Sequence, residues 1–254
     1  MTQLAERTPQ PLSELSAPSV ADLRVKIFAD GADLAGMLDM ARRPYIRGFT
    51  TNPTLMRKAG VSDYRAFAQQ VLAAITDRPI SFEVFADEPV EMERQAREIA
   101  SWGDHVYVKI PVTDTAGQPM DRLIEQLSHS GVKVNVTAMM TLDQVQRVAA
   151  AVEGGAASYL SVFAGRIADT GRDPLPMMAA AVDLLKDIPT AELLWASPRE
   201  LLNIFHADSI GCHVITVTND VLAKLDLVGK PLDDYSLDTV RMFARDAAAA
   251  GFTL

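Results

Sequence analysis

The sequence predicts an α/β fold, a single (β/α)8 barrel of the TIM type, from the order and number of its apolar runs. From Leu23 onward, short runs of β-branched and apolar residues alternate with amphipathic helical stretches. The runs start about every 20–35 residues, the length of one βα unit, and eight such units suit a barrel of ~250 residues. The expected strands are residues 25–30, 45–50, 79–86, 105–112, 131–137, 157–163, 191–197 and 212–217.

Helical stretches separate these runs, and several carry recognisable start or stop signals. Thr141 with Gln144 resembles a capping box, Pro89 suits a first helical turn, and Gly251 follows the last helix. The expected helices are residues 33–43, 62–77, 89–102, 119–130, 141–151, 174–187, 198–208, 219–226 and 236–250.

The same pattern sets the expected domain boundaries and leaves one alternative fold. Residues 1–22, rich in Pro, Ser and Thr, are expected to form a loosely ordered N-terminal arm. Residues 23–254 are expected to form the catalytic barrel domain, including its C-terminal helix. The alternative is an open, doubly wound sheet, but such sheets usually have fewer strands, and no Gly-x-Gly-x-x-Gly follows the first strand here.

Composition restricts the class of partner. The formal net charge of −9 argues against nucleic acid, because phosphate binding usually shows as a basic patch. No apolar run approaches the ~20 residues that span a bilayer, and no secretory signal is recognisable. The single cysteine, Cys212, excludes an intrachain disulfide and suits a reducing cytosol. We therefore expect a cytoplasmic protein without nucleic-acid or membrane partners, and self-association into a homo-oligomer stays open.

Lys109 is the most informative single residue. It lies in the run His-Val-Tyr-Val-Lys-Ile-Pro-Val, residues 105–112, where a strand of a parallel sheet should be buried and apolar. An ammonium group loses its hydration in such a place, and burial favours the neutral amine, which is a nucleophile toward carbonyls. The plainer interpretation is a lysine at a strand end whose ammonium reaches water.

Polar residues recur near the carboxyl ends of the expected strands, where barrels of this type build their active sites. Asp30 and Glu83 are costly in apolar strands unless they meet a cation or hydrogen-bond donors. Together with Lys109 they form either a buried ion pair or a Schiff-base lysine beside a proton-transferring carboxylate. Taken singly, the others are as readily explained as polar core residues bonded to neighbouring backbone. They are Thr51, Asn52, Asn135, Thr137, Ser161 and Ser197.

Two arginines and the histidines complete the candidates. Arg166 follows the sixth expected strand after Gly165, and Arg199 stands at the start of the seventh expected helix. Arginines beside a helix N-terminus suit a phosphate group, although each could be an ordinary solvated arginine. The histidines show no ligand spacing with Cys212, so we expect no metal site. They are His105, His129, His206 and His213.

Five motifs in fixed order resemble the transaldolase family. They are Gly-Phe-Thr-Thr-Asn-Pro-Thr-Leu (48–55), Val-Lys-Ile-Pro-Val-Thr (108–113), Asn-Val-Thr-Ala (135–138), Ser-Val-Phe-Ala-Gly-Arg-Ile (161–167) and Ala-Ser-Pro-Arg (196–199), and they are spread in the family's order across nearly the whole of residues 25–225. The resemblance implies a (β/α)8 barrel, a Schiff-base lysine on the fourth strand, phosphorylated sugars as substrates, and neither a metal nor an organic cofactor.

The resemblance also implies a role for each matching residue. Lys109 would be the nucleophile, and Asp30 the general acid/base that handles the C4 hydroxyl. Glu83 and Thr137 would hold the water that carries protons during imine formation. The residues that would contact the sugar are Asn52, Asn135, Ser161 and Phe163. The residues that would contact its phosphate are Arg166, Ser197 and Arg199.

Two positions separate branches of the family. Members resembling fructose-6-phosphate aldolase have Gln in place of Glu83 and Tyr in place of Phe163, so the chain resembles true transaldolases. Pro198 departs from the usual Phe between the phosphate-binding Ser and Arg. The expected activity is transfer of a dihydroxyacetone unit from a ketose phosphate, of the sedoheptulose 7-phosphate or fructose 6-phosphate type, to an aldose phosphate. The alternatives are an aldolase that releases dihydroxyacetone, a specialised transaldolase making an unusual sugar phosphate, and a non-catalytic sugar-phosphate-binding barrel.

Overall fold

The computed structural model describes residues 19–251, and these fall into two compact units. The larger unit runs from Leu23 to Ala223, and the described part of the smaller unit is residues 19–22 together with residues 224–251. Of the predicted arm, only residues 19–22 are described, with a 3-10 turn, η2, at Val20–Asp22. The prediction that residues 23–254 form one domain stays a prediction.

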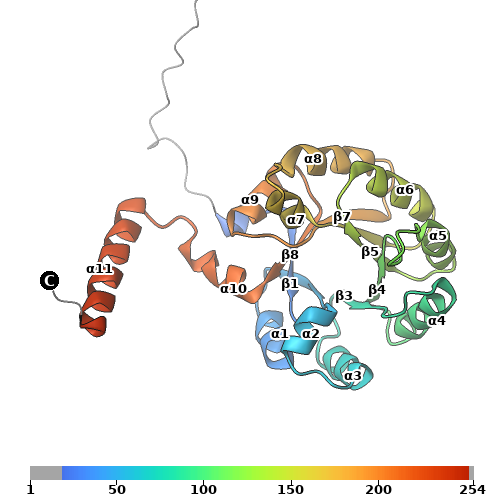
Figure 1. Ribbon diagram of the computed structural model, residues 1–254, viewed down its shortest axis with the longest axis horizontal. Coiled ribbons are helices and arrows are strands. Elements are labelled where there is room, and N and C mark those ends of the chain that lie inside the picture. The colour runs from blue at the N-terminus through green and yellow to red at the C-terminus, as the bar shows by residue number, and fades with distance from the viewer. Residues whose placement is uncertain (1–18, 252–254) are drawn as a thin grey trace, which may run out of the picture. The chain divides into compact units, whose positions relative to one another are not determined.

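The larger unit is a closed barrel of eight parallel strands, each hydrogen-bonded to its neighbours in chain order, and helices surround it (Figure 1). This confirms the predicted (β/α)8 fold and excludes the open sheet. The strands are β1 (Lys26–Asp30), β2 (Ile46–Thr50), β3 (Ile80–Glu83), β4 (Val106–Pro111), β5 (Val134–Met139), β6 (Ser158–Val162), β7 (Ala191–Trp195) and β8 (Val214–Thr218).

The helices follow the predicted order, and their local signals are used as expected. Thr141 and Gln144 form the predicted capping box, Pro89 opens α4, and Gly251 adopts the left-handed conformation, with φ of 67°, after the last helix. The helices are α1 (Leu34–Ala41), α2 (Pro53–Lys58), α3 (Tyr64–Ala74), α4 (Pro89–Ala100), α5 (Asp121–His129), α6 (Leu142–Val152), α7 (Ala164–Asp169), α8 (Leu175–Leu184), α9 (Leu202–Ser209), α10 (Asn219–Leu222), the 3-10 helix η3 (Ala223–Leu227) and α11 (Leu232–Ala250).

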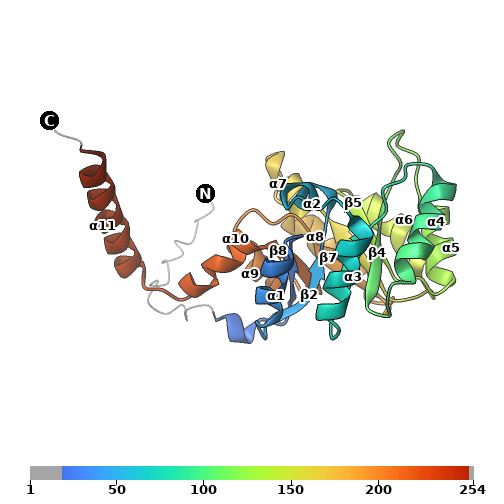
Figure 2. The same cartoon turned by 90° about the horizontal axis from the view of Figure 1, so that it is seen from below.

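The structure corrects the predicted elements in a few places. Strand β3 ends at Glu83 rather than at residue 86, because the backbone N–H groups of Phe85 and Ala86 bond to the side chain of Gln95 in α4. Two short helices, α2 and α7, were not predicted, and both lie at the same end of the barrel (Figure 2). Each directly follows a strand, so this is the end where the strand carboxyl termini lie.

A packed layer of side chains fills the middle of the barrel. Phe28 lies edge-on to Tyr159 with ring centroids 5.5 Å apart, and both belong to a buried cluster with Leu194 and Val214. At Gly48 a Cβ atom would lie 2.6 Å from the Phe28 ring, so only glycine lets β2 approach that ring. The layer therefore separates the two open ends of the barrel.

Candidate active site

A cavity of about 660 Å³ opens at the carboxyl ends of the strands. Its volume is within the range of ~300–1,000 Å³ usual for small-molecule sites. Every residue to which the resemblance assigned a role lines this cavity, from five strands and from the segments that follow β2, β6 and β7. They are Asp30, Asn52, Glu83, Lys109, Asn135, Thr137, Ser161, Phe163, Arg166, Ser197 and Arg199.

Lys109 on β4 is buried, with 8% of the residue exposed. Its Nζ donates to the backbone oxygen of Thr51, at 2.9 Å, and forms an ion pair with Glu83 Oε2, at 3.1 Å. Glu83 and Lys109 are paired across β3 and β4, so the sheet register itself brings the two together. Lys109 is thus largely withdrawn from water, and its amine lies beside a carboxylate in the lining of the cavity.

Asp30, the last residue of β1, is held by two donors from the β2 end. Oδ1 accepts from Thr50 Oγ1 at 2.8 Å, and Oδ2 accepts from Asn52 Nδ2 at 3.4 Å. Burial raises the pKa of Asp30 above its ordinary value, and the charge of Lys109 and the Thr50 hydrogen bond offset this only in part. A carboxyl group with a raised pKa changes its protonation state more readily near neutral pH, as a proton-transfer group must.

The amide groups of Asn52 and Asn135 are held in place by hydrogen bonds at both the oxygen and the nitrogen. Asn52 caps α2 by accepting from the Leu55 N–H at 2.9 Å, which turns its NH2 group toward Asp30. Asn135 accepts from Ser161 Oγ at 2.6 Å and donates to Ser81 Oγ at 3.0 Å. Thr51, by contrast, is the satisfied polar core residue that we considered, because its hydroxyl bonds to the Ser81 carbonyl.

The hydroxyl of Thr137 is buried and has no hydrogen-bond partner among residues 19–251. It is placed by β5, whose next residue, Ala138, has φ of 67°, in the left-handed region that residues with a Cβ rarely adopt. A buried hydroxyl facing a cavity without a protein partner is suited to bind a water molecule or a ligand group.

The three candidate phosphate-binding residues, Arg166, Ser197 and Arg199, come from two segments whose backbones lie very close together. A Cβ atom on Gly165 would lie 1.6 Å from the Ser197 carbonyl oxygen, so this glycine lets α7 touch the loop after β7. Ser197 itself has φ of 60°. The Arg166 guanidinium lies 5.3 Å from the Phe163 ring centre, and Arg199 is held by both carboxylate oxygens of Asp169.

Arg199 does not start a helix, as the sequence predicted. Helix α9 begins at Leu202, because the Asn203 side chain accepts from the backbone N–H groups of Arg199 and Glu200 and holds this segment as a loop. The phosphate prediction at Arg199 therefore rests on its guanidinium group rather than on a helix N-terminus.

Two sets of contacts were not predicted from the sequence. The Tyr64 hydroxyl on α3 accepts from the Glu83 N–H at 2.7 Å and donates to the Glu83 carbonyl at 3.0 Å, holding the backbone of the residue that pairs with Lys109. Thr50 bonds Asp30 and also the hydroxyl of Thr216 on β8. The only sequence signal for Thr50 was its place before Thr51 at a strand end, and Tyr64 gave none.

The chain belongs to the transaldolase/fructose-6-phosphate aldolase family, whose model matches residues 27–254. A "probable transaldolase" of Dehalococcoides mccartyi is 34% identical over 83% of this chain and 93% of its own length. One from a Thermoanaerobacter species is 33% identical over 91% of this chain and 100% of its own, and a "probable transaldolase 2" of Listeria monocytogenes is 30% identical over 84% and 93%. The chain is thus an enzyme of this family.

Solved structures support the fold alone. A protein described as a "putative lyase/mutase" from Burkholderia cenocepacia superposes with a TM-score of 0.54 at 16% identity, covering 90% of this chain and 85% of its own. A mandelate oxidase variant gives 0.52 at 14% identity, over 90% and 80%. Within residues 19–251, no helix combines the length and apolar character that crossing a bilayer requires. The same residues contain no group of three or more His, Cys, Asp or Glu side chains placed to hold a metal ion.

Proposed function

We propose that this protein is a transaldolase that transfers a dihydroxyacetone unit from a ketose phosphate to an aldose phosphate through a Schiff base on Lys109. The observation that carries the proposal is the position of Lys109 Nζ, buried on the cavity floor and 3.1 Å from the Glu83 carboxylate. The family membership and the names of the relatives support the same reaction.

Imine formation needs a neutral amine and a route for protons. The Lys109 amine attacks the ketone carbon C2 of the donor, and the resulting carbinolamine loses water to give an iminium ion. Glu83 can take the proton from the ammonium across their existing contact. The free hydroxyl of Thr137 and the Glu83 carboxylate both face the cavity and suit the water that delivers protons to the departing hydroxyl.

Carbon–carbon cleavage needs a base on the other side of the substrate. Asp30 removes the proton of the C4 hydroxyl, the C3–C4 bond breaks, and its electron pair moves into the iminium to form an enamine. The aldose leaves, and the enamine attacks the aldehyde carbon of an acceptor while Asp30 returns the proton. Hydrolysis of the new imine releases the product and restores Lys109. The raised pKa of Asp30 suits both directions of this transfer.

The other lining residues would orient the sugar between these groups. Asn52, Asn135 and Ser161 present amide and hydroxyl groups to the substrate hydroxyls. Arg166, Ser197 and Arg199 at the rim would take the phosphate, and the bond from Asp169 holds the Arg199 guanidinium before substrate arrives. Glu83 and Phe163, rather than Gln and Tyr, favour attack of the enamine on an acceptor over its protonation and hydrolysis to free dihydroxyacetone.

A mass-spectrometric screen of donor and acceptor phosphosugar pairs tests this function. We expect the purified enzyme to form new ketose phosphates from sedoheptulose 7-phosphate or fructose 6-phosphate with an aldose phosphate. Release of free dihydroxyacetone without transfer would instead identify an enzyme of the fructose-6-phosphate aldolase type. Transfer that occurs only with an uncommon acceptor would identify a specialised transaldolase. Absence of transfer, release and any borohydride-trapped adduct would leave only a sugar-phosphate-binding barrel.

A further inference from the structure

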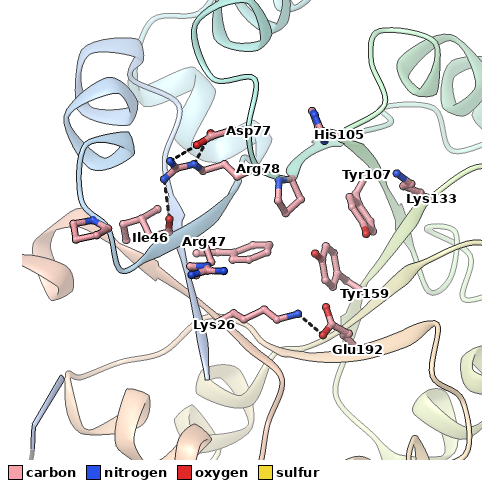
Figure 3. Close-up of a pocket in the computed structure, with 13 residues that line it drawn as sticks. Lys26, Ile46, Arg47, Asp77, Arg78, His105, Tyr107, Lys133, Tyr159 and Glu192 are labelled. Atoms are coloured by element: carbon pink, nitrogen blue, oxygen red, sulfur yellow. Dashed lines mark hydrogen bonds and ion pairs between the residues drawn. The ribbon is translucent and has the colours of Figure 1, made fainter. Parts of the chain in front are cut away.

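A second cavity, of about 560 Å³, opens at the opposite end of the barrel, and we call it the amino-end pocket (Figure 3). Its residues lie at or just before the starts of the strands, as Lys26 does on β1 and Lys133 does before β5. It shares no lining residue with the cavity around Lys109. The buried layer of Phe28, Tyr159 and Leu194 lies between the two, so the pocket is a separate site.

The amino-end pocket is positively charged in an acidic protein. Four permanent cations line it, against two carboxylates, whereas the whole chain has a net charge of −9. The cations are Lys26, Arg47, Arg78 and Lys133, and the carboxylates are those of Asp77 and Glu192. Such a local excess of positive charge attracts an anion, because the field of the acidic surface does not cancel it at short range.

Both carboxylates of the pocket are already paired. The Arg78 guanidinium donates two hydrogen bonds to the Asp77 carboxylate, of 2.8 and 2.7 Å, and Lys26 Nζ donates to Glu192 at 2.6 Å (Figure 3). The Arg78 guanidinium also donates to the Ile46 carbonyl at 2.8 Å, which fixes its position. The positive excess therefore falls on the two remaining cations, Arg47 and Lys133.

In the part of the chain that the structure describes, neither remaining cation has an acidic partner. Within residues 19–251, the Arg47 side chain makes no hydrogen bond or ion pair. Lys133 Nζ donates only to the Asp104 carbonyl, at 2.7 Å, and lies 5.9 Å from the Tyr107 ring centre. An anion with several oxygen atoms can accept hydrogen bonds from Arg47 and Lys133 together. The planar guanidinium group of Arg47 matches the oxygen spacing of a phosphate or a carboxylate.

Aromatic rings form an apolar wall of the same pocket. Tyr107 and Tyr159 are stacked with ring centroids 4.3 Å apart. The stacked rings offer a surface for the apolar part of a ligand, and the two cations beside them can bind its negatively charged group. We propose that the amino-end pocket binds the phosphate group of a small molecule, either inorganic phosphate or a phosphate monoester. This proposal does not depend on the reaction at Lys109.

Thermal unfolding of the full chain, titrated with inorganic phosphate at constant ionic strength, tests the proposal. The background variant is Arg166→Ala/Arg199→Ala, which disables the phosphate candidates at the other end of the barrel. We expect its unfolding midpoint to rise with phosphate along a saturating curve, because a ligand that binds only the folded state stabilises it. No rise in this background would overturn the proposal.

Pocket variants in the same background locate the binding. Arg47→Ala should weaken phosphate binding about tenfold or more, since a charge-assisted hydrogen bond is lost. Arg47 is exposed, so the variant should fold normally, and Lys133→Met should act in the same direction. The matched control is Arg122→Ala, which removes one equally exposed arginine outside the pocket. Equal affinities in Arg47→Ala and Arg122→Ala would contradict the proposal, because only net charge would then matter.

Two further ligands identify the source of the phosphate group. Glycerol 3-phosphate is a monoester without a carbonyl, so it cannot react with a lysine, and adenosine 5′-monophosphate adds a base that could stack on the tyrosine wall. If the affinity for all three ligands depends on Arg47, the result supports the site. The ligand that then binds most tightly identifies the ligand class. Binding of either monoester that is insensitive to Arg47→Ala would place it elsewhere and count against the pocket.

Discussion

The two ends of the barrel carry the same kinds of residue in opposite settings. Strand β1 contributes to both, with Lys26 at the amino end, Asp30 at the carboxyl end and Phe28 in the layer between. Each end also has a Lys–Glu pair. The Lys26–Glu192 pair is 2.6 Å long with side chains 46% and 27% exposed, and the Lys109–Glu83 pair is 3.1 Å long with side chains 9% and 19% exposed.

Burial, and not distance, decides what such a pair can do. The shorter pair at the amino end is screened by water and salt, so it contributes little to stability. At the carboxyl end, the same kinds of charge have lost most of their water, so an amine and a carboxylate lie in contact away from bulk solvent. The exposed end is therefore suited to binding an anion, and the buried end to chemistry.

The largest effect in this set should come from Asp30→Asn. Asn keeps the shape but cannot take the C4 hydroxyl proton, so turnover should fall by ~10²–10⁴-fold while imine formation continues. Turnover and the borohydride-trapped adduct are measured in parallel on the same preparation. If trapping is lost together with turnover, Asp30 serves Lys109 rather than the cleavage step.

A smaller effect is expected for Tyr64→Phe, which removes the two bonds that hold the Glu83 backbone. Loss of these bonds leaves a partly buried N–H without a partner, at a cost of about 1–3 kcal/mol. We expect the rate of imine formation to fall about tenfold with an unchanged KM, as measured by single-turnover trapping.

Tyr45→Phe is the control for this variant, since Tyr45 is also half-buried and makes no hydrogen bond within residues 19–251. A purely structural role for Tyr64 would lower the unfolding temperature and leave the trapping rate per folded molecule unchanged.

Thr50→Val should move the pH dependence of turnover. The Thr50 hydroxyl is one of the groups that lower the pKa of Asp30, which burial raises, so removing it raises that pKa further. Cleavage needs the ionised carboxylate, and activity falls as pH drops through this pKa. The acidic limb of the kcat profile should therefore shift to higher pH.

Thr218→Val, which also lines the cavity but removes a hydroxyl that makes no hydrogen bond to the Asp30 carboxylate, should leave that limb in place. If the acidic limb of the kcat profile stays fixed in Thr50→Val, or moves to lower pH, a group other than Asp30 controls that limb.

The smallest effect should come from Lys26→Met at the amino end. Because the Lys26–Glu192 pair is exposed, its removal should change the free energy of unfolding by at most about 1 kcal/mol. Urea unfolding at low and high salt measures this. A loss well above that value would mean that exposure does not distinguish the two pairs, and the comparison between the ends would fail.

Much of the fold was predictable, because a strand buried on both faces leaves a continuous apolar run. All eight strands and their order follow from such runs, and Thr141 and Gly251 show that caps work through local chemistry alone. The end of β3 was not predictable, because Gln95, ten residues beyond Phe85, takes over the hydrogen bonds that would have extended it. The short helices α2 and α7 are too brief for periodicity to show.

Some residues of the candidate site could likewise be predicted from the sequence, and others could not. Polar residues at strand ends could be predicted, because parallel strands bring their carboxyl ends to one rim. Tyr64 could not, since its partner lies 19 residues away and its helix shows only an ordinary apolar face. Gly165 entered the sequence argument only as the residue before Arg166. The reason that a glycine is required there is the Ser197 carbonyl, which only the folded chain brings near.

The central claim is that the amine of Lys109, and of no other lysine, forms the Schiff base. The most direct test is to incubate the enzyme with fructose 6-phosphate, reduce with borohydride, digest, and map the adduct by mass spectrometry. We predict one modified peptide carrying Lys109, and no adduct in Lys109→Met that still gives a folded circular-dichroism spectrum. An adduct on any other lysine, or an active enzyme that traps no sugar, would contradict the account.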